Sequence, residues 1–154
     1  MKTETKAVDP LLRFEEEHRH ALRELDILEH AIDGLESGKH AEPLLEAVAD
    51  VHTFLNTAVK RHNENEEVAL FPHLGDDAPT ALFIEEHATL RGFERQLGDA
   101  LRADDPADAV CEPAREIVSL LRAHIQREDE VLFPMARGLL GPEGLALVSR
   151  GLKG

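Results

Sequence analysis

The chain has 154 residues, the size of one ordinary domain, and 42% of them are hydrophobic, which is enough for a buried core. Acidic residues outnumber basic ones by 31 to 17, and the resulting net charge of −14 argues against a phosphate-backbone partner. Aromatic residues make up only 4%, with no Trp or Tyr, while Glu, Leu, Ala and Arg are abundant, so the composition predicts an all-α protein.

Cysteine usage and hydropathy exclude further classes of protein. Cys111 is the single cysteine, so an internal disulfide framework and a cysteine-rich zinc module are excluded. Residues 1–8 lack the apolar stretch of a secretion signal, and no apolar run approaches the ~20 residues of a membrane span. We therefore expect a cytoplasmic protein with no nucleic-acid partner and no membrane partner.

Capping and turn residues divide the chain into four long helical segments. The first begins at Asp9-Pro10, an N-cap followed by a proline at the first helical position, and runs to Gly34 or Gly38. The second is expected over about 42–72, and the third over about 79–103.

The fourth segment begins at Asp105-Pro106 and is expected to end near Gly138. Pro113 predicts either a kink in this segment or a helix that starts only there. A short amphipathic helix around 145–148 should then pack across one end.

Short connections between helices of this length favour antiparallel neighbours. The sequence therefore predicts an antiparallel up-down-up-down four-helix bundle with a short C-terminal helix. No linker or change in composition divides the chain, so residues 1–154 are expected to form a single domain with its bundle core at about 9–140.

The four segments form two related pairs. Glu16-Glu17-His18 in the first segment recurs as Glu85-Glu86-His87 in the third. In the second and fourth segments the repeated elements are His62, Glu66 and Leu70-Phe71-Pro72, which recur as His124, Glu128 and Leu132-Phe133-Pro134.

Helical periodicity places polar residues of this repeat on apolar faces. His62 and Glu66 continue the face of Leu55 and Val59, and the fourth segment places its His–Glu pair in the same way. A carboxylate on such a face needs a compensating positive charge, and no Lys or Arg lies on either stripe. A lone inward histidine is more often a hydrogen-bonded core residue, but the repeat of the whole pattern indicates a site.

Six residues are thus candidate metal ligands: His18, His62, Glu66, His87, His124 and Glu128. Four imidazoles and two carboxylates fit two adjacent metal ions bridged by the carboxylates. A single zinc ion would leave two polar groups stranded, and calcium or magnesium would not select imidazoles. The Glu-x2-His pattern of ferritin-like proteins occurs only in the first segment, so that arrangement does not apply.

This combination of histidines, His-x3-Glu pairs and Leu-Phe-Pro sequences resembles the hemerythrin-like (HHE cation-binding) domain over about residues 9–150. The resemblance implies a non-haem di-iron centre with two iron ions, joined by an oxo or hydroxo bridge. It implies terminal ligation by the four histidines and bridging by the two glutamates. Two assignments stay open: His20 in place of His18, and Asp129 in place of Glu128, because the oxygen carriers have a His-x4-Asp spacing in that helix.

The sequence departs from the oxygen carriers in the third helix, where they have a pair of histidines four residues apart. Phe83 and Arg91 stand four residues from His87, so the fifth histidine is missing. More coordination positions are therefore open to exchangeable ligands, which predicts a poor reversible oxygen carrier. His30, His52 and His73 are expected to be surface histidines.

The resemblance implies that the protein binds or reacts with a small oxidant, either a diatomic ligand (O2 or nitric oxide) or peroxide, as a sensor, scavenger or iron-handling factor. One alternative is a di-iron enzyme that decomposes peroxide or nitric oxide, and another is a metal store or donor. The sequence names no redox partner.

Overall fold

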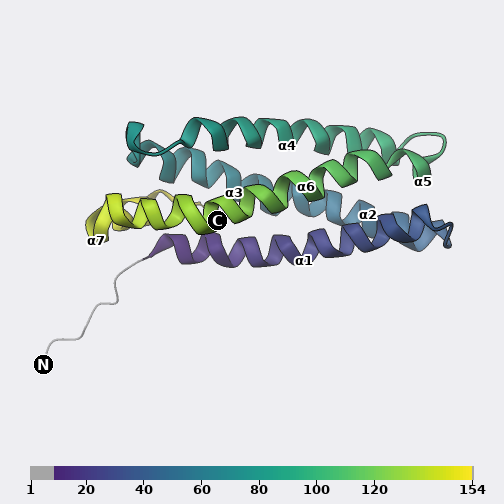
Figure 1. Ribbon diagram of the computed structural model, residues 1–154, viewed down its shortest axis with the longest axis horizontal. Coiled ribbons are helices and arrows are strands. Elements are labelled where there is room, and N and C mark those ends of the chain that lie inside the picture. The colour runs from purple at the N-terminus through teal and green to yellow at the C-terminus, as the bar shows by residue number, and fades with distance from the viewer. Residues whose placement is uncertain (1–8, 154) are drawn as a thin grey trace, which may run out of the picture.

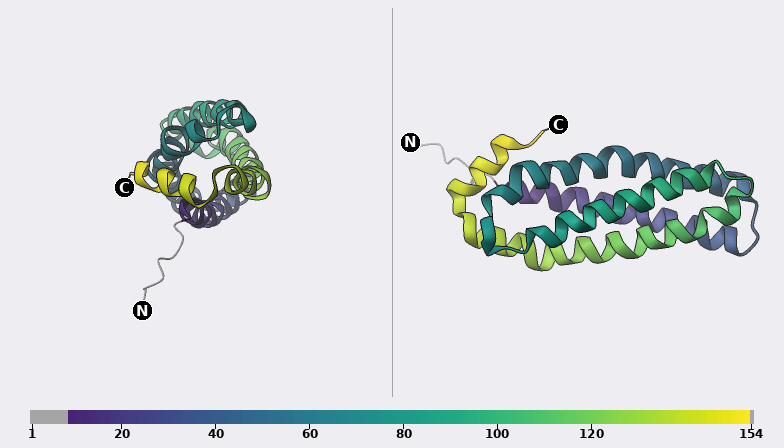
Figure 2. Two further views of the ribbon diagram at one scale, coloured as in Figure 1. Left: turned by 90° about the vertical axis from the view of Figure 1, so that its left-hand side faces the viewer. Right: turned by 90° about the horizontal axis from the view of Figure 1, so that it is seen from above.

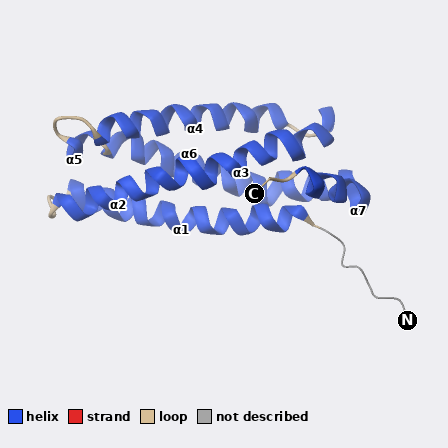
Figure 3. Ribbon diagram, turned by 180° about the vertical axis from the view of Figure 1, so that it is seen from behind, coloured by secondary structure: helices blue, strands red, loops and turns tan. Residues whose placement is uncertain are grey.

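Four helical rods lie side by side in the computed structural model, which describes residues 9–153 (Figure 1). The part of the chain that is described contains helices and no strand (Figure 3), which confirms the predicted all-α class. Seen end on, the rods surround a common core (Figure 2). The expectation that residues 1–8 contain no secretion signal concerns residues that the structure does not describe.

The first rod is α1 (Pro10–Glu36), and the third is α4 (Thr80–Leu101). The second rod joins α2 (Ala41–Phe54), η1 (Leu55–Val59), α3 (Lys60–Asn65) and η2 (Glu66–Leu70), and is followed by the short turns η3 (Phe71–His73) and η4 (Gly75–Asp77). The fourth rod joins α6 (Cys111–Arg127), η5 (Glu128–Leu132) and the first part of α7 (Phe133–Gly151), after the single turn α5 (Pro106–Ala109).

Local sequence explains where these helices begin. The side chain of Asp9 accepts a hydrogen bond from the Leu11 amide over 3.0 Å, so the predicted N-cap of α1 is confirmed. The fourth rod begins at Cys111 instead of residue 105, and Pro113 therefore lies in its first turn, where its missing N–H is not needed. The helix does not kink at this proline.

α1 packs against α2 and α6, and α4 packs against the same two helices from the opposite side. The α1–α2 connection and α5 lie at one end of the bundle, while residues 71–79 and α7 lie at the other (Figures 1 and 2). The core consists of two hydrophobic clusters, one built around Leu25, Leu55, Leu97 and Ile117 and the other around phenylalanines near the α7 end.

Each rod passes from one cluster to the other through its buried histidine. In α1, for example, Phe14 belongs to one cluster and Ala21 to the other, and His18 lies between them. The four inward histidines therefore form a polar layer that is enclosed between two apolar ones. This layer is where the predicted site lies.

Glu66 and Glu128 each begin a π-helical segment, which is a wider turn than the α-helix on either side. Each segment ends two residues before a proline, Pro72 or Pro134. A proline lacks the N–H that would close an α-helical turn and crowds the carbonyl four residues before it, so the chain is predisposed to depart from α geometry here.

The bend at Gly141, with φ 62° and ψ −176°, separates the last part of α7 from the fourth rod. Beyond the bend, Leu145 and Val148 are buried in the cluster that contains Leu11 and Phe14, so the expected short helix does pack across one end. By length and composition alone, the helical run Pro106–Gly151 is apolar enough to cross a membrane. This is weak evidence, because the run bends at Gly141 and contributes residues to the bundle core.

Replacing Gly141 by alanine should lower the free energy of unfolding by about 1–3 kcal/mol, because this backbone region is open essentially to glycine alone. A new Cβ meets no atom within 4 Å at Gly141 or at Gly138, so neither substitution creates a clash. Gly138→Ala, in the regular part of the same helix, is the matched control and should raise stability by up to about 1 kcal/mol. Urea denaturation of both variants measures the difference, and equal effects would contradict this account of the bend.

Candidate metal centre

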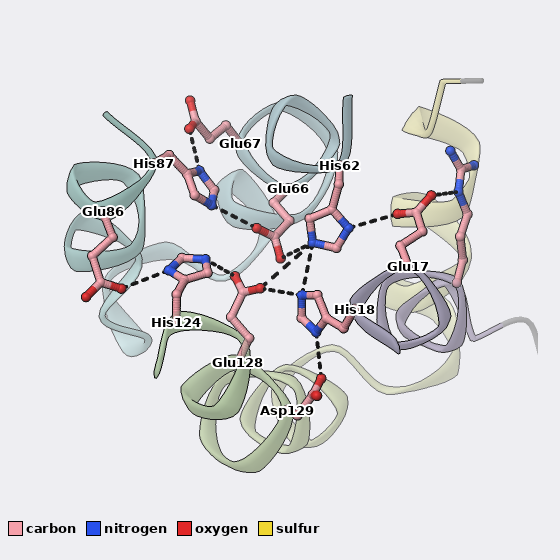
Figure 4. A network of polar contacts seen from close by, with 11 residues as sticks. Glu17, His18, His62, Glu66, Glu67, Glu86, His87, His124, Glu128 and Asp129 are labelled. Atoms are coloured by element: carbon pink, nitrogen blue, oxygen red, sulfur yellow. Dashed lines mark hydrogen bonds and ion pairs between the residues drawn. The ribbon is translucent and has the colours of Figure 1, made fainter. Parts of the chain in front are cut away.

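The six predicted ligands come together in one buried layer (Figure 4). They come from all four rods: His18 from α1, His62 from α3, Glu66 from η2, His87 from α4, His124 from α6 and Glu128 from η5. Both glutamates are 0% exposed, and none of the histidines is more than 6% exposed.

The six residues form two groups of potential metal ligands that share both glutamates. One group contains His18 and His62, and the other contains His87 and His124. Within each group, one ligand atom from every residue lies within 4.8 Å of the others.

In the first group, Nε2 of His18 lies 2.9 Å from Oε1 of Glu128, and Nε2 of His62 lies 3.3 Å from Oε2 of Glu66. The Nε2 atoms of the two histidines are 3.1 Å apart. This group therefore uses one oxygen of each glutamate.

The second group uses the remaining oxygens. Nε2 of His87 lies 3.1 Å from Oε1 of Glu66, and Nε2 of His124 lies 3.3 Å from Oε2 of Glu128. Each carboxylate thus offers one oxygen to each group, which is the arrangement that two bridged cations require.

Several buried polar atoms of this layer have no hydrogen-bond partner as long as the histidines are neutral with the proton on Nδ1. They include all four carboxylate oxygens of Glu66 and Glu128 and the Nε2 atoms of His87 and His124. Burying such groups unpaired is costly, and a carboxylate most of all, unless a cation or a charged partner compensates them. Imidazole and carboxylate together are donors suited to first-row transition metals, so these residues fit a pair of such ions.

A second layer of carboxylates surrounds the histidines. Each Nδ1 atom faces one of them: His18 faces Asp129 at 2.8 Å, His62 faces Glu17 at 2.8 Å, His87 faces Glu67 at 2.6 Å and His124 faces Glu86 at 2.8 Å. Because an ionised carboxylate only accepts, each Nδ1–H donates to it and the Nε2 lone pair points to the centre. We call these four residues the outer carboxylates.

Arginines hold two of the outer carboxylates. Arg13 contacts Glu17 over 3.3 Å, and Arg127 forms an ion pair with Glu86. Arg13 also donates to the main-chain carbonyl oxygen of Lys153 over 2.7 Å.

Four phenylalanines fix the histidine rings. Phe133 and Phe71, from the two Leu-Phe-Pro sequences, stack on His18 and His87 with centroid separations of 5.4 and 6.1 Å. Phe14 and Phe83 meet His62 and His124 edge-on at 5.0 and 5.3 Å. Every imidazole is thereby held by an outer carboxylate and an aromatic ring.

The structure distinguishes the candidate ligands that the sequence left as alternatives. His20 is exposed and packs against Phe54 at 4.6 Å, outside both ligand groups. Asp129 is 35% exposed and faces Nδ1 of His18, whereas Glu128 lies in the centre.

The other histidines lie away from the centre. His30 and His73 are exposed, as expected. The expectation for His52 is wrong: it is half-buried and donates from Nε2 to the main-chain carbonyl of Glu94 over 2.9 Å. Its contact lies between the second and third rods, where sequence periodicity alone does not place it.

The roles of the outer carboxylates were not predicted. A signal for two of them was present, because Glu17 and Glu86 are the second glutamates of the repeated Glu-Glu-His sequence. The first glutamates, Glu16 and Glu85, are exposed. Sequence alone does not show which glutamate of each pair contacts a histidine on the neighbouring rod.

Charges in the layer shift the pKa values of its members in opposite directions. Burial lowers the pKa of His124, but hydrogen bonding to Glu128 and the charge of that residue outweigh burial and raise it to about 9. Burial likewise opposes charging of His62, yet the neighbouring Glu66 and Glu128 raise its pKa well above the usual value. Burial raises the pKa of Glu128, but hydrogen bonds from His124, His18 and His62 outweigh it and hold the pKa well below its usual range.

A family model for the hemerythrin HHE cation-binding domain matches residues 9–136. The chain therefore belongs to this family, and its buried histidine and glutamate groups are those of a metal-binding protein. No curated protein and no solved structure matches the chain.

Glu17→Gln should weaken metal binding by about 10–100-fold, because an amide holds the His62 ring and its tautomer less firmly than a carboxylate. Glu16→Gln is the matched control, since Glu16 is the adjacent glutamate and its side chain is 72% exposed. Competition against a chelator of known affinity measures both. Equal affinities for the two variants would show that Glu17 does not support the ligand.

The melting temperature of the metal-free protein should fall as the pH rises from about 6.5 to about 9. A histidine whose pKa is higher in the folded chain stabilises the fold below its unfolded pKa of about 6.5, and this stabilisation is lost as the pH rises through the folded value. For His124 that folded pKa is about 9. Calorimetry at successive pH values measures the fall.

Glu94 also contributes to the pH dependence of stability, and its contribution must be distinguished from that of the histidines. Burial raises its pKa to about 7 against the opposing charges of Arg91, Arg95 and Lys60. Its contribution falls as the pH rises from the unfolded carboxyl pKa toward 7 and levels off above that value. Glu94→Gln should therefore keep the fall above about pH 7.5. A flat profile in this variant would assign the fall to Glu94.

Proposed function

We propose that the chain binds two iron ions, one in each ligand group, in an up-down-up-down bundle, and that this di-iron centre binds or reacts with a small oxidant. The candidate ligands are the six residues of the two groups. The observation that carries the proposal is that Glu66 and Glu128 each offer one oxygen to each group. One metal ion would leave half of these donors without a partner.

Iron suits the donor atoms of the centre and agrees with the family to which the chain belongs. Two imidazoles and two carboxylate oxygens for each metal suit iron, whereas a soft-metal site would contain thiolates. Bound iron supplies one-electron chemistry and direct coordination of O2, nitric oxide or peroxide. Four protein donors for each ion leave room for such a ligand.

The protein's own residues orient and insulate the centre. The outer carboxylates fix the tautomer of each histidine and increase its basicity as a ligand. Both glutamates are 0% exposed, and this burial strengthens the electrostatic attraction between their carboxylates and a cation. A protein with this centre is suited to act as a sensor, scavenger or iron-handling factor.

The iron content tests the first part of the proposal. The wild-type chain, loaded anaerobically with ferrous iron, should hold about two ions and melt at a higher temperature than the metal-free chain, since the metal binds only the folded state. Glu66→Ala and Glu128→Ala should lose both ions, because each carboxylate serves both groups. Glu64→Ala and Glu130→Ala, which remove exposed glutamates from the same rods, are the controls.

Exposure of the reduced, iron-loaded protein to O2 tests the second part. We expect progressive oxidation that removal of O2 does not reverse, because the missing fifth histidine leaves both ions with exchangeable positions. A repeatable return to the reduced spectrum would identify a reversible oxygen carrier instead. If the protein retains iron that does not react with O2, nitric oxide or peroxide, its function is that of a metal store or donor.

A further inference from the structure

Residues 152 and 153 leave α7 and lie against the second rod. Leu152 has extended backbone angles, φ −71° and ψ 140°, and ends the helix. The side-chain amide of Asn65 pairs with the main chain of Lys153: its Nδ2 donates to the carbonyl oxygen over 3.0 Å, and its Oδ1 accepts from the N–H over 3.0 Å. Asn65 is 4% exposed, and a buried amide needs such partners. We call residues 152–153 the latch.

The latch also contacts α1. The carbonyl oxygen of Lys153 accepts a second hydrogen bond, from Nη2 of Arg13 over 2.7 Å. Nε of Arg13 donates to Oε2 of Glu17 over 3.3 Å, and Oε1 of Glu17 accepts from Nδ1 of His62 over 2.8 Å. Asn65 and His62 belong to the same helix, α3, so these contacts begin and end on the rod that carries the ligand.

The internal repeat shows what the latch replaces. In the second half, Arg127 follows His124 by three residues and forms an ion pair with Glu86, the carboxylate that holds His124. The equivalent residue, three positions after His62, is Asn65. An amide carries no charge, so this position supplies no cation to the outer carboxylate that faces His62.

The first half takes its cation from α1 instead. Arg13 lies four residues before Glu17, whereas the equivalent residue in the third rod is the exposed Leu82. An ion pair of this spacing at the surface contributes little on its own, because both side chains remain free to move. The hydrogen bond to the Lys153 carbonyl orients the guanidinium, and Asn65 holds that carbonyl in place.

We propose that the latch positions a metal ligand: through Arg13 it holds Glu17 on His62. Arg127 does the same for His124 without an intermediary. Opening of the latch should therefore loosen His62 and leave His124 in place, so that the ion of the first ligand group is released faster. This inference rests on the proposed function, because its consequence for the metal requires His62 to be a ligand.

Apolar packing holds the rest of the terminal segment without the latch. Leu145 and Val148 are buried in one of the two core clusters. The helix beyond Gly141 should therefore stay on the end of the bundle when the hydrogen bonds of residues 152–153 are broken. The latch can thus be opened without unfolding the segment that carries it.

Lys153→Pro opens the latch, because it removes the N–H that donates to Asn65. A residue before proline is restricted to extended angles, and Leu152 already has them, so the substitution leaves the helix intact. Lys153→Ala, which keeps both main-chain hydrogen bonds, is the matched control.

NMR of the metal-free chains measures how fast the Nδ1–H protons of His62 and His124 exchange with water. Lys153→Pro should accelerate this exchange at His62 by about tenfold, the equivalent of one hydrogen bond. His124 is the internal reference and should be unchanged, and Lys153→Ala should change neither rate.

An arginine on the second rod should make the latch unnecessary. Asn65→Arg, combined with Lys153→Pro, gives the first half the arrangement that Arg127 has in the second, and should return the exchange at His62 toward the wild-type rate. Asn65→Leu, combined with Lys153→Pro, supplies no charge and should not. If the latch served only to pack the chain, arginine and leucine would give the same rate, and the inference would be wrong.

Two further results would overturn the inference: equal acceleration at His62 and His124, or an unchanged rate at His62 in Lys153→Pro. In the iron-loaded protein, half of the iron should leave Lys153→Pro for a chelator about threefold faster than it leaves Lys153→Ala, a smaller effect than the loss of an outer carboxylate. Equal release from the two variants would also contradict the latch.

The NMR comparison needs no metal, so it separates this inference from the proposed function. A chain that shows the expected exchange rates but binds no iron would contradict the proposed function and retain the latch. A chain that binds two irons but shows no difference between His62 and His124 in Lys153→Pro would retain the function and overturn the latch.

Discussion

The constraint on which the structure depends is the burial of two carboxylates, Glu66 and Glu128, in the middle of a helical bundle. Both are 0% exposed, and the imidazole Nε2 atoms beside their oxygens can donate to them only when the histidines are protonated. Removing an ionised carboxylate from water costs several kcal/mol unless positive charge compensates it. The four imidazoles, the outer carboxylates and the arginines form successive layers of alternating charge around this pair.

These layers account for the coupling between metal binding and folding. Without a metal, the histidines supply the positive charge, which explains why the pKa values of His62 and His124 are raised. A metal ion replaces those protons, because only a neutral imidazole offers its lone pair. The same buried groups thus serve two charge states of the centre, and protons compete with metal for them.

Sequence predicted the six central residues because two regularities coincide there. Helical periodicity placed His62 and Glu66 on an apolar face, and the repeat identified their counterparts. Periodicity did not predict the π-helical segment that begins at Glu128. The resemblance to the oxygen carriers, which have a His-x4-Asp spacing in that helix, left Asp129 open as an alternative. The outer carboxylates escaped prediction because they are partly exposed: on one helix, Glu17 resembles the solvated Glu16, and only the position of His62 on the next rod distinguishes them.

The repeat also shows which positions the centre constrains and which it leaves free. Phe14 and Phe83 occupy equivalent positions and make the same edge-on contact with a histidine. One turn or more away from the layer the halves diverge: Leu25 fills the core, while its equivalent in the third rod is Glu94, a buried carboxyl whose pKa burial raises to about 7.

The end of the described chain adds a mechanical constraint to this electrostatic one. Asn65, next to Glu66, pairs through its amide with the main-chain N–H and carbonyl of Lys153 over 3.0 Å each. Arg13 joins the same carbonyl to Glu17, which holds His62. The segment beyond the bend at Gly141 is therefore tied to the first ligand group from outside, so that displacing it would loosen both Glu17 and the turn that carries Glu66. Glu66 belongs to both ligand groups, so the contacts of Asn65 support the whole centre, whereas the contact through Arg13 and Glu17 supports only His62 among the histidines.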